Sequence, residues 1–345
     1  MTEPDTKKID SLLQQMVEDD KFSGTVLVHK KGEVIFEKAY GLACKRFSVP
    51  NTIETKYNIG SLNKLITKIA ILQLLQRGLL DLDDYVGKYL PDYPKDIASK
   101  VKVRHLLSFK SGLGDYFNEK FPKVIGQLRK LDDFVELFID DPLLFEPGEK
   151  MHYSNAGYVV LGKIIEAISG MDYYEYVREK IYKPASMNDS DHFELDFPTP
   201  NLATGYTLNQ QCNPDGTGQL QFRRNNFYLI GTKGSSAGGG YSTVRDMMRF
   251  DQAIDKEVLL DAKHSKMVMR PIDADPQSKS KSAILAGGAP GLTALYFKFF
   301  EVGYTVFIFS NYDPDDVEPL VQPIRSIFLP DEETGKIVTM REHRE

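Results

Sequence analysis

The segment Asn58-Ile-Gly-Ser61-Leu-Asn-Lys64 leads directly into the apolar run Leu65-Ile-Thr-Lys-Ile-Ala-Ile-Leu-Gln-Leu-Leu-Gln76. Serine is a good residue for the start of a helix, and an asparagine and a glycine precede it, so the sequence predicts a helix that begins at Ser61. Apolar residues lie on nearly every side of this run, which indicates a helix buried in the centre of the protein.

Ser61 and Lys64 would lie one turn apart on the same face of this helix, a spacing that suits a nucleophile and its base. A lysine at the mouth of a buried helix is poorly solvated, which disfavours its charged form. A neutral amine beside a hydroxyl can take its proton, and the free N–H groups of a helix start can stabilise an oxyanion. The alternative is that Ser61 only caps the helix and Lys64 is a solvated residue of the first turn.

The composition limits the class of protein. The chain has 345 residues, enough for one large domain with an insertion or for two domains that share a core. The formal net charge of −6 argues against a nucleic-acid partner, and no run approaches the length of a membrane span. The N-terminus lacks the apolar core of a signal peptide, which favours a cytoplasmic protein, or a periplasmic or secreted one if a leader has been removed.

The cysteines and histidines indicate neither a metal site nor a cofactor. Cys44 and Cys212 are not in C-x-x-C spacing; a disulfide between them stays open, although nothing in the sequence supports it. The six histidines show neither H-x-x-x-H nor H-x-H spacing, so we expect no metal. The glycine run 238–240 lacks the frame of a phosphate-binding loop.

Two hairpins are predicted, one near each end of the chain. Residues 24–30 and 33–39 are typical of strands, and Lys31-Gly32 between them suits a tight turn. Residues 292–300 and 303–311 are expected to form the second hairpin. Between and around these hairpins, helices are expected over residues 5–20, 61–76, 101–109, 132–139, 156–168, 173–182, 243–254 and 317–328.

The remaining chain is expected to be irregular. Residues 185–233 should form loops and short strands, residues 270–284 a polar and flexible segment, and about the last fifteen residues a frayed end. Strands at both ends with helices in the middle predict an α+β protein of the α/β sandwich type, in which the N- and C-terminal segments form one antiparallel sheet flanked by helices.

This pattern also predicts a division of the chain. We expect residues 1–80 and 200–345 to form the α/β domain that holds the sheet, and residues 81–199 to form an inserted, mainly helical lobe. The active site would then lie in the cleft between the two.

Tyr153-Ser-Asn155, at the start of a predicted helix, can supply partners for the serine and the lysine. A tyrosine phenol near an amine can relay protons, and Asn155 can hydrogen-bond the same amine or a substrate amide. The alternatives are a tyrosine of the core and an asparagine that caps the helix.

Gly287-Gly288-Ala-Pro-Gly291 precedes the last predicted hairpin. A turn of glycines beside an edge strand can present a backbone N–H to a developing oxyanion. Together with the N–H of Ser61, that of Gly288 would complete an oxyanion hole.

In these segments the chain resembles the serine β-lactamase-related family, which includes class C β-lactamases, D-Ala-D-Ala carboxypeptidases, D-aminopeptidases and family VIII esterases. Ser61-Leu-Asn-Lys64 matches the S-x-x-K motif and Tyr153-Ser-Asn155 matches the Y-x-N motif. The resemblance covers roughly residues 20–312 and implies a β-lactamase/transpeptidase-like fold. Flanking segments that share the likeness are 106–113, 147–158 and 237–243.

The resemblance implies a cofactor-independent serine hydrolase that acts on a small ester, amide or β-lactam through an acyl-enzyme. Ser61 would be the nucleophile, with Lys64 and Tyr153 as the acid–base pair, and which of the two is the base stays open because coupled groups share the proton. The substrate-binding residues would be Asn155, Gly287 and Gly288. The oligomeric state is not indicated.

One motif departs from the family. The third motif, [KH]-[TSG]-G, is best matched by Leu285-Ala286-Gly287, which lacks the basic residue. A shifted match at Lys281 restores the charge but loses the glycine. The missing charge argues against substrates that carry a carboxylate, such as penicillins. It also leaves two rivals open: a penicillin-recognising protein that acylates without turnover, and an inactive binding scaffold.

Overall fold

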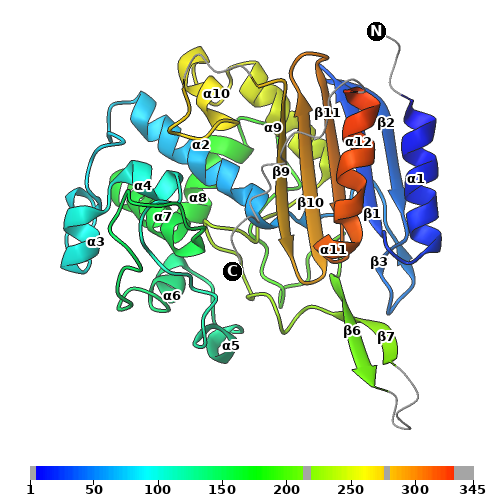
Figure 1. Cartoon of the computed structure of the whole chain (residues 1–345), viewed down its shortest axis with the longest axis horizontal. Helices are drawn as coiled ribbons and strands as arrows, with labels where there is room; N and C mark the ends of the chain where they lie inside the picture. The colour runs from blue at the N-terminus through cyan, green and yellow to red at the C-terminus, as the bar shows by residue number, and fades with distance from the viewer. Residues whose placement is uncertain (1–4, 213–218, 276–279, 330–345) are drawn as a thin grey trace.

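A five-stranded antiparallel sheet, in the order β2-β1-β11-β10-β9, lies in the right half of the computed structural model as Figure 1 shows it, and the mainly helical segment lies on the left. The structure describes residues 5–212, 219–275 and 280–329. The strands are β1 (Gly24–Lys30), β2 (Glu33–Tyr40), β9 (Ser282–Ala289), β10 (Leu292–Phe299) and β11 (Tyr304–Ser310). Because β1 pairs with β11, the two terminal hairpins share one sheet, and the predicted fold class is confirmed.

Helices cover both faces of this sheet (Figure 1). On one face, α1 (Thr6–Glu18) and α12 (Val321–Phe328) bury an apolar stripe that includes Ile9, Leu13 and Ile324. On the other face, α9 (Val244–Asp255) packs against β1 and β11. Within the described residues, every helix is too short or too polar to span a bilayer.

The central helix α2 (Asn63–Gln76) lies in the larger of two apolar cores and is buried on nearly every side, as its sequence predicts. The α-helix proper begins at Asn63, because Gly60–Leu62 form a separate 3-10 turn, η1. The prediction that the α-helix starts at Ser61 is therefore wrong by two residues. The turn still places Ser61 and Lys64 on one side.

The segment between residues 81 and 199 is mainly helical. Its longest helix, α7 (Asn155–Ser169), packs against α2. The shorter helices are α3 (Lys95–Lys100), α4 (Val103–Leu107), α5 (Phe121–Val124), α6 (Leu131–Val135) and α8 (Tyr173–Val177). Helix α6 is shorter than the predicted 132–139 segment. The division of the chain into 1–80 with 200–345 and 81–199 stays a prediction.

Short two-stranded pairs join these parts. They are β3 (Leu42–Cys44) with β4 (Val49–Pro50), β5 (Tyr57–Asn58) with β8 (Tyr241–Ser242), and β6 (Tyr206–Cys212) with β7 (Gln219–Asn225). The β6–β7 hairpin projects from the body in Figure 1. Cys44 is a free thiol, so the disulfide left open by the sequence does not form.

Near the C-terminus one prediction needs correction. Residues 282–284, expected to be flexible, are the start of β9, whose ladder with β10 supplies the order that their polar neighbours conceal. Helix α10 (Ala262–Val268) precedes this region. Residues 276–279 and the end predicted to fray, 330–345, lie outside the described residues.

A buried polar cluster fixes α9 to the sheet. Asp251 on α9 is fully buried and accepts hydrogen bonds from Lys298 at 2.7 Å, Thr305 at 3.1 Å and the Tyr296 hydroxyl. His29 lies 3.3 Å from the same carboxylate. Burial raises the pKa of Asp251, but the nearby His29, the charge of Lys298 and the hydrogen bonds from Lys298 and Tyr296 outweigh this effect and hold the pKa below its usual value.

We predict that Asp251→Asn lowers the free energy of unfolding by about 3 kcal/mol at neutral pH, because it leaves buried donors without their charged acceptor. Urea unfolding measures this loss. Asp255→Asn is the matched control, since this carboxylate is 52% exposed and also binds Lys298; it should cost less than about 1 kcal/mol.

The pH dependence tests the same cluster. Because folding lowers the pKa of Asp251, its stabilisation is present above the usual carboxyl pKa and is lost as the pH falls through the lowered value. The difference between the parent protein and Asp251→Asn should therefore narrow below about pH 4. An unchanged difference in strong acid contradicts this account.

Candidate active site

Ser61, Lys64 and Tyr153 meet in the structure, as their motifs predict. The Tyr153 hydroxyl lies 2.7 Å from Ser61 Oγ, and Lys64 Nζ donates to the same oxygen at 3.2 Å. Tyr153 comes from the segment just before α7, so two parts of the chain that are 92 positions apart converge on one hydroxyl. The three side chains form a continuous hydrogen-bonded set.

Lys64 is buried, with 1% of its surface exposed, and its hydrogen-bond partners are neutral. Besides Ser61, Nζ donates to Asn155 Oδ1 at 2.7 Å and to the carbonyl oxygen of Ala237 at 2.6 Å. The rings of Tyr153 and Tyr158 face the amine, with their centroids 4.8 and 5.5 Å from Nζ. The amine is therefore held by dipoles and aromatic faces.

Asn155 is positioned by a carboxylate on the opposite side. Its Nδ2 donates to Asp115 Oδ2 at 2.8 Å, and its backbone N–H donates to the same oxygen at 3.2 Å. Ser154, whose hydroxyl accepts from the Gly157 N–H, caps α7. Asn155 is thus free of the capping role that the sequence left open, and its carbonyl oxygen is turned toward Lys64.

The strand β9 runs against the 3-10 turn that carries the serine. A Cβ at Gly287 would lie 2.0 Å from the carbonyl oxygen of Ile59 and 2.8 Å from the Ser61 nitrogen. A Cβ at Gly60, which has φ +50°, would lie 2.8 Å from the Gly288 nitrogen. Only glycines allow this approach, which packs the backbone of Gly287 and Gly288 directly against the turn that carries Ser61.

A pocket of about 1160 Å³ opens over these groups. Its lining includes Ser61, Tyr153, Asn155, Gly287 and Gly288, so it contains every site residue that the sequence predicts apart from the buried Lys64. Among the described residues, no group of three or more His, Cys, Asp or Glu side chains is placed to hold a metal ion.

Position 285 offers the pocket no charge. Leu285 is half-buried, packs against the larger apolar core and pairs across the sheet with Tyr296. It is absent from the described residues that line the pocket, whereas Ala286 is present. Where the third motif has a basic side chain, this chain therefore has an apolar side chain that packs against the core.

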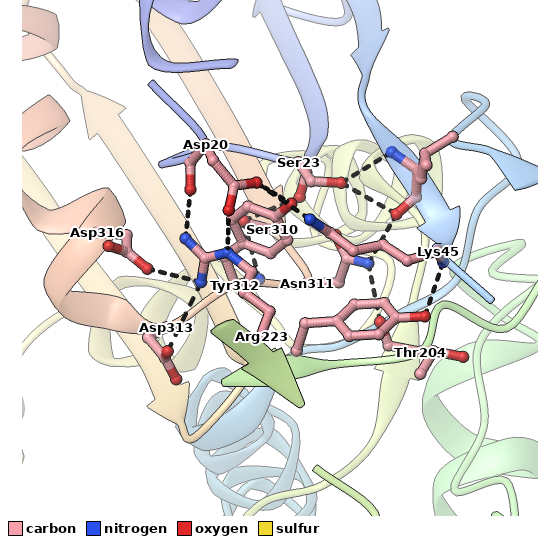
Figure 2. Close-up of polar contacts among 12 residues, drawn as sticks. Asp20, Ser23, Lys45, Thr204, Arg223, Ser310, Asn311, Tyr312, Asp313 and Asp316 are labelled. Carbon is pink, nitrogen blue, oxygen red and sulfur yellow. Dashed lines mark hydrogen bonds and ion pairs between the residues drawn. The ribbon is translucent and has the colours of Figure 1, made fainter. Parts of the chain in front are cut away.

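The β6–β7 hairpin forms part of the pocket wall through Thr207 and Leu208. Figure 2 shows how its base is fixed: Arg223 of β7 lies among Asp20, Asp313 and Asp316 and against the Tyr312 ring. The guanidinium carbon is 3.6 Å from the ring centroid, and the side chain is 4% exposed.

Asp313 links this anchor to the strand that lines the site. Its two carboxylate oxygens accept from the backbone nitrogens of Leu208 and Gly291, each at 2.6 Å. Asn226 Nδ2 donates to the Pro290 carbonyl oxygen at 2.9 Å. The turn after Gly288 and the hairpin base are therefore joined.

Sequence reasoning missed three contributors: the Asp115 carboxylate, the Ala237 carbonyl and the Arg223 anchor. The glycine run after Ala237 did carry a signal, since a Cβ at Gly238 would lie 3.3 Å from the Gly60 carbonyl oxygen. Such a run indicates close backbone approach as well as a turn. Nothing in the local sequence of Asp115 or Arg223 indicates their partners.

The fold is that of the β-lactamase/transpeptidase-like proteins. The family model described as Beta-lactamase matches residues 9–289 of the chain. The chain therefore belongs to the beta-lactamase family.

The individual relatives agree with this assignment. A penicillin-binding protein of Bacillus subtilis (strain 168) is 27% identical over 339 residues, which are 90% of this chain and 72% of that protein. The crystal structure of a penicillin binding protein from Bacillus halodurans superposes with a TM-score of 0.77 at 29% identity, over 90% of this chain and 98% of that chain.

A more distant structure shares the fold. The D-amino acid amidase from Ochrobactrum anthropi SV3, complexed with D-phenylalanine, has a TM-score of 0.75 at 24% identity, over 94% of this chain and 99% of that chain. At this identity the likeness shows the fold alone.

We predict that Arg223→Met loosens the base of the β6–β7 hairpin, because it removes the charge that holds three carboxylates together. Hydrogen–deuterium exchange should become at least about 10-fold faster in the backbone of residues 206–212 and 219–225, with α2 unchanged. Arg224→Met, at the exposed neighbouring position, is the matched control and should leave exchange as it is. Equal exchange in both variants contradicts the anchoring role.

Proposed function

We propose that this protein is a serine hydrolase that forms an acyl-enzyme on small ester or amide substrates. The observation that carries the proposal is the position of Ser61 Oγ, 2.7 Å from the Tyr153 hydroxyl and 3.2 Å from Lys64 Nζ. A hydroxyl with two proton-transfer partners at these distances is an activated nucleophile.

The contacts of Lys64 suit a base. A neutral amine has two N–H bonds and one lone pair. The carbonyl oxygens of Asn155 and Ala237 accept both N–H bonds, so the lone pair is left facing Ser61 Oγ. Protonation adds a third N–H, which donates to the same oxygen. Both states of the amine are therefore hydrogen-bonded without movement of the backbone.

During acylation, a proton moves from Ser61 to the Lys64–Tyr153 pair and then from Tyr153 to the leaving group. The Ser61 proton passes to the Lys64–Tyr153 pair as Oγ bonds to the substrate carbonyl carbon and the carbonyl π electrons move to oxygen. The backbone nitrogens of Ser61 and Gly288 stabilise this oxyanion. When the carbonyl re-forms, the bond to the leaving group breaks, and Tyr153 donates a proton to the leaving group.

Deacylation reverses these roles. A water molecule gives a proton to the Lys64–Tyr153 pair and attacks the acyl carbon. The Ser61–acyl bond then breaks, Ser61 Oγ regains a proton, and the carboxylic acid product leaves. Because both groups contact the same hydroxyl, no single group is assigned as the base.

The replacement of a basic residue by Leu285 favours substrates without a carboxylate beside the scissile bond. A half-buried apolar side chain cannot compensate the desolvation of such a group. Neutral esters and amides therefore fit the proposal better than penicillins or peptides that end in D-alanine.

A second candidate function is that of a penicillin receptor, because two similar proteins are penicillin-binding proteins. The chain would then form a stable acyl-enzyme and release it slowly. Intact mass separates the two: turnover of a chromogenic ester supports the hydrolase, a lasting adduct without turnover supports the receptor, and neither result supports an inactive scaffold.

We predict that Ser61→Ala lowers the turnover of p-nitrophenyl acetate at least about 1,000-fold, with little change in thermal stability, because the nucleophile is lost and the fold is not. Lys64→Met should lower the turnover to a similar extent. Stopped assays with intact mass spectrometry measure turnover and the acyl adduct together.

Lys68→Met is the matched control for the lysine. This second lysine of α2 is buried, and burial lowers its pKa to about 7, yet its amine donates to the carbonyl oxygens of Val268 and Arg270, away from the pocket. It should keep the parent turnover. Full activity in Ser61→Ala ends the proposal.

We predict that Leu285→His raises kcat/KM for nitrocefin, which carries a carboxylate, about 10-fold relative to p-nitrophenyl acetate, because it adds a donor and a charge beside the site. Val34→His, at the exposed far edge of the sheet, should change neither rate. If Leu285→His leaves the ratio of the two rates unchanged, our interpretation of the third motif is wrong.

A further inference from the structure

We propose that the pocket is built for a substrate with a bulky apolar acyl group, bound on an aromatic shelf beside the nucleophile. This inference rests on the proposed hydrolase function and adds a substrate class to it. The shelf is defined as Tyr116, Phe117, Phe121, Leu229 and Ile230, all of which line the pocket.

The shelf exposes apolar surface inside the pocket. Phe117 is 50% exposed and Leu229 is 47% exposed, although both lie in a concave part of the molecule. The Phe117 ring is 4.5 Å from that of Tyr116 and 4.7 Å from that of Phe121, so it is supported from behind by two buried rings. Exposed apolar side chains that converge in a groove mark a ligand site.

The two parts of the shelf come from distant segments that are tied together. The Thr232 nitrogen donates to the Ile125 carbonyl oxygen at 3.1 Å, and its hydroxyl donates to the same oxygen at 3.3 Å. These bonds hold the segment with Leu229 beside the segment with Phe121. The shelf is therefore a fixed surface built from both sides of the pocket.

The shelf adjoins the catalytic amine through two routes. Asp115, directly before Tyr116, binds Asn155, which binds Lys64 Nζ. The Tyr116 hydroxyl lies 3.4 Å from Ser235 Oγ, two positions before the carbonyl that holds the same amine. The first rings of the shelf thus lie next to the groups that surround the nucleophile.

The geometry assigns the acyl portion of the substrate to this shelf. Tyr153, as the proton donor, places the leaving group on its own side of the site. The Phe109 ring stacks on the Tyr153 ring there, with the two ring centroids 4.8 Å apart. The nitrogens of Ser61 and Gly288 take the carbonyl oxygen. The side bounded by Asn155 and the shelf is left for the acyl substituent.

The shelf residues carry no charge, and Leu285 adds none, so the affinity of this arm must come from burial of apolar surface. Each buried methylene adds a roughly constant increment to the binding free energy, which raises the affinity about 4-fold. A longer acyl chain should therefore be preferred until the shelf is covered.

The test is a series of p-nitrophenyl esters with acetate, butyrate, hexanoate and octanoate, assayed below their micelle concentrations with the full chain. We expect kcat/KM to rise at least about 10-fold from acetate to octanoate, since six methylenes are added. A rate that is flat or falls along the series overturns the inference. A parallel series of acetate esters with phenol or 2-naphthol should show no comparable gain, and a gain confined to that series also overturns it.

Variants separate the shelf from general damage. Phe117→Ala and Leu229→Ala should each lower kcat/KM for octanoate about 10-fold and that for acetate less than about 2-fold. The matched control is Tyr228→Ala, next to Leu229, 85% exposed and not among the described residues that line the pocket; it should leave both rates unchanged. Equal losses on octanoate and acetate, or a loss in Tyr228→Ala like that in Leu229→Ala, contradict the shelf.

The two proposals fail in different ways. If acetate is hydrolysed through Ser61 but chain length has no effect, the hydrolase stands and the shelf is wrong. If Ser61→Ala leaves acetate turnover intact, the proposed function itself is wrong, whatever the chain-length profile.

Discussion

The structure depends on a buried amine held by neutral partners. Lys64 has almost no contact with solvent, and its hydrogen bonds go to a hydroxyl, an amide and a backbone carbonyl. A buried amine without such partners would be costly, so the three segments that supply them must be in place together. The helix α2, the start of α7 and the loop at Ala237 are therefore positioned by one polar contact set as well as by their apolar packing.

A second constraint is steric. Strand β9 touches the turn of Ser61 so closely that Gly60 and Gly287 cannot carry a side chain. The sheet thereby reaches the nucleophile through backbone atoms, while side chains reach it from the helical segment. The pocket walls farther from Ser61 are held by other interactions. These are stacked aromatic rings on one side and an arginine among carboxylates on the other. The proposed catalytic groups and the pocket walls are thus held in place by different parts of the molecule.

The sequence predicts what depends on local pattern. The hairpins at both ends, the buried helix and the meeting of Ser61, Lys64 and Tyr153 follow from periodicity, turn residues and short motifs. The beginning of β9 was missed because its order comes from pairing with β10. The contacts of Asp115 and Arg223 were missed because each partner lies at least 40 positions away, which a single sequence does not reveal. The sequence shows that position 285 is uncharged, but only the fold shows that Leu285 packs against the larger apolar core.

The strand order has a consequence for biosynthesis. Strand β11 lies between β1 and β10, yet it is translated long after β1, with the whole helical segment between them. During translation the edge of β1 that pairs with β11 therefore stays open until β11 has emerged. The turn of Ser61 is likewise translated long before β9, which packs against it, so the two backbone groups of the proposed oxyanion hole come together only late in synthesis.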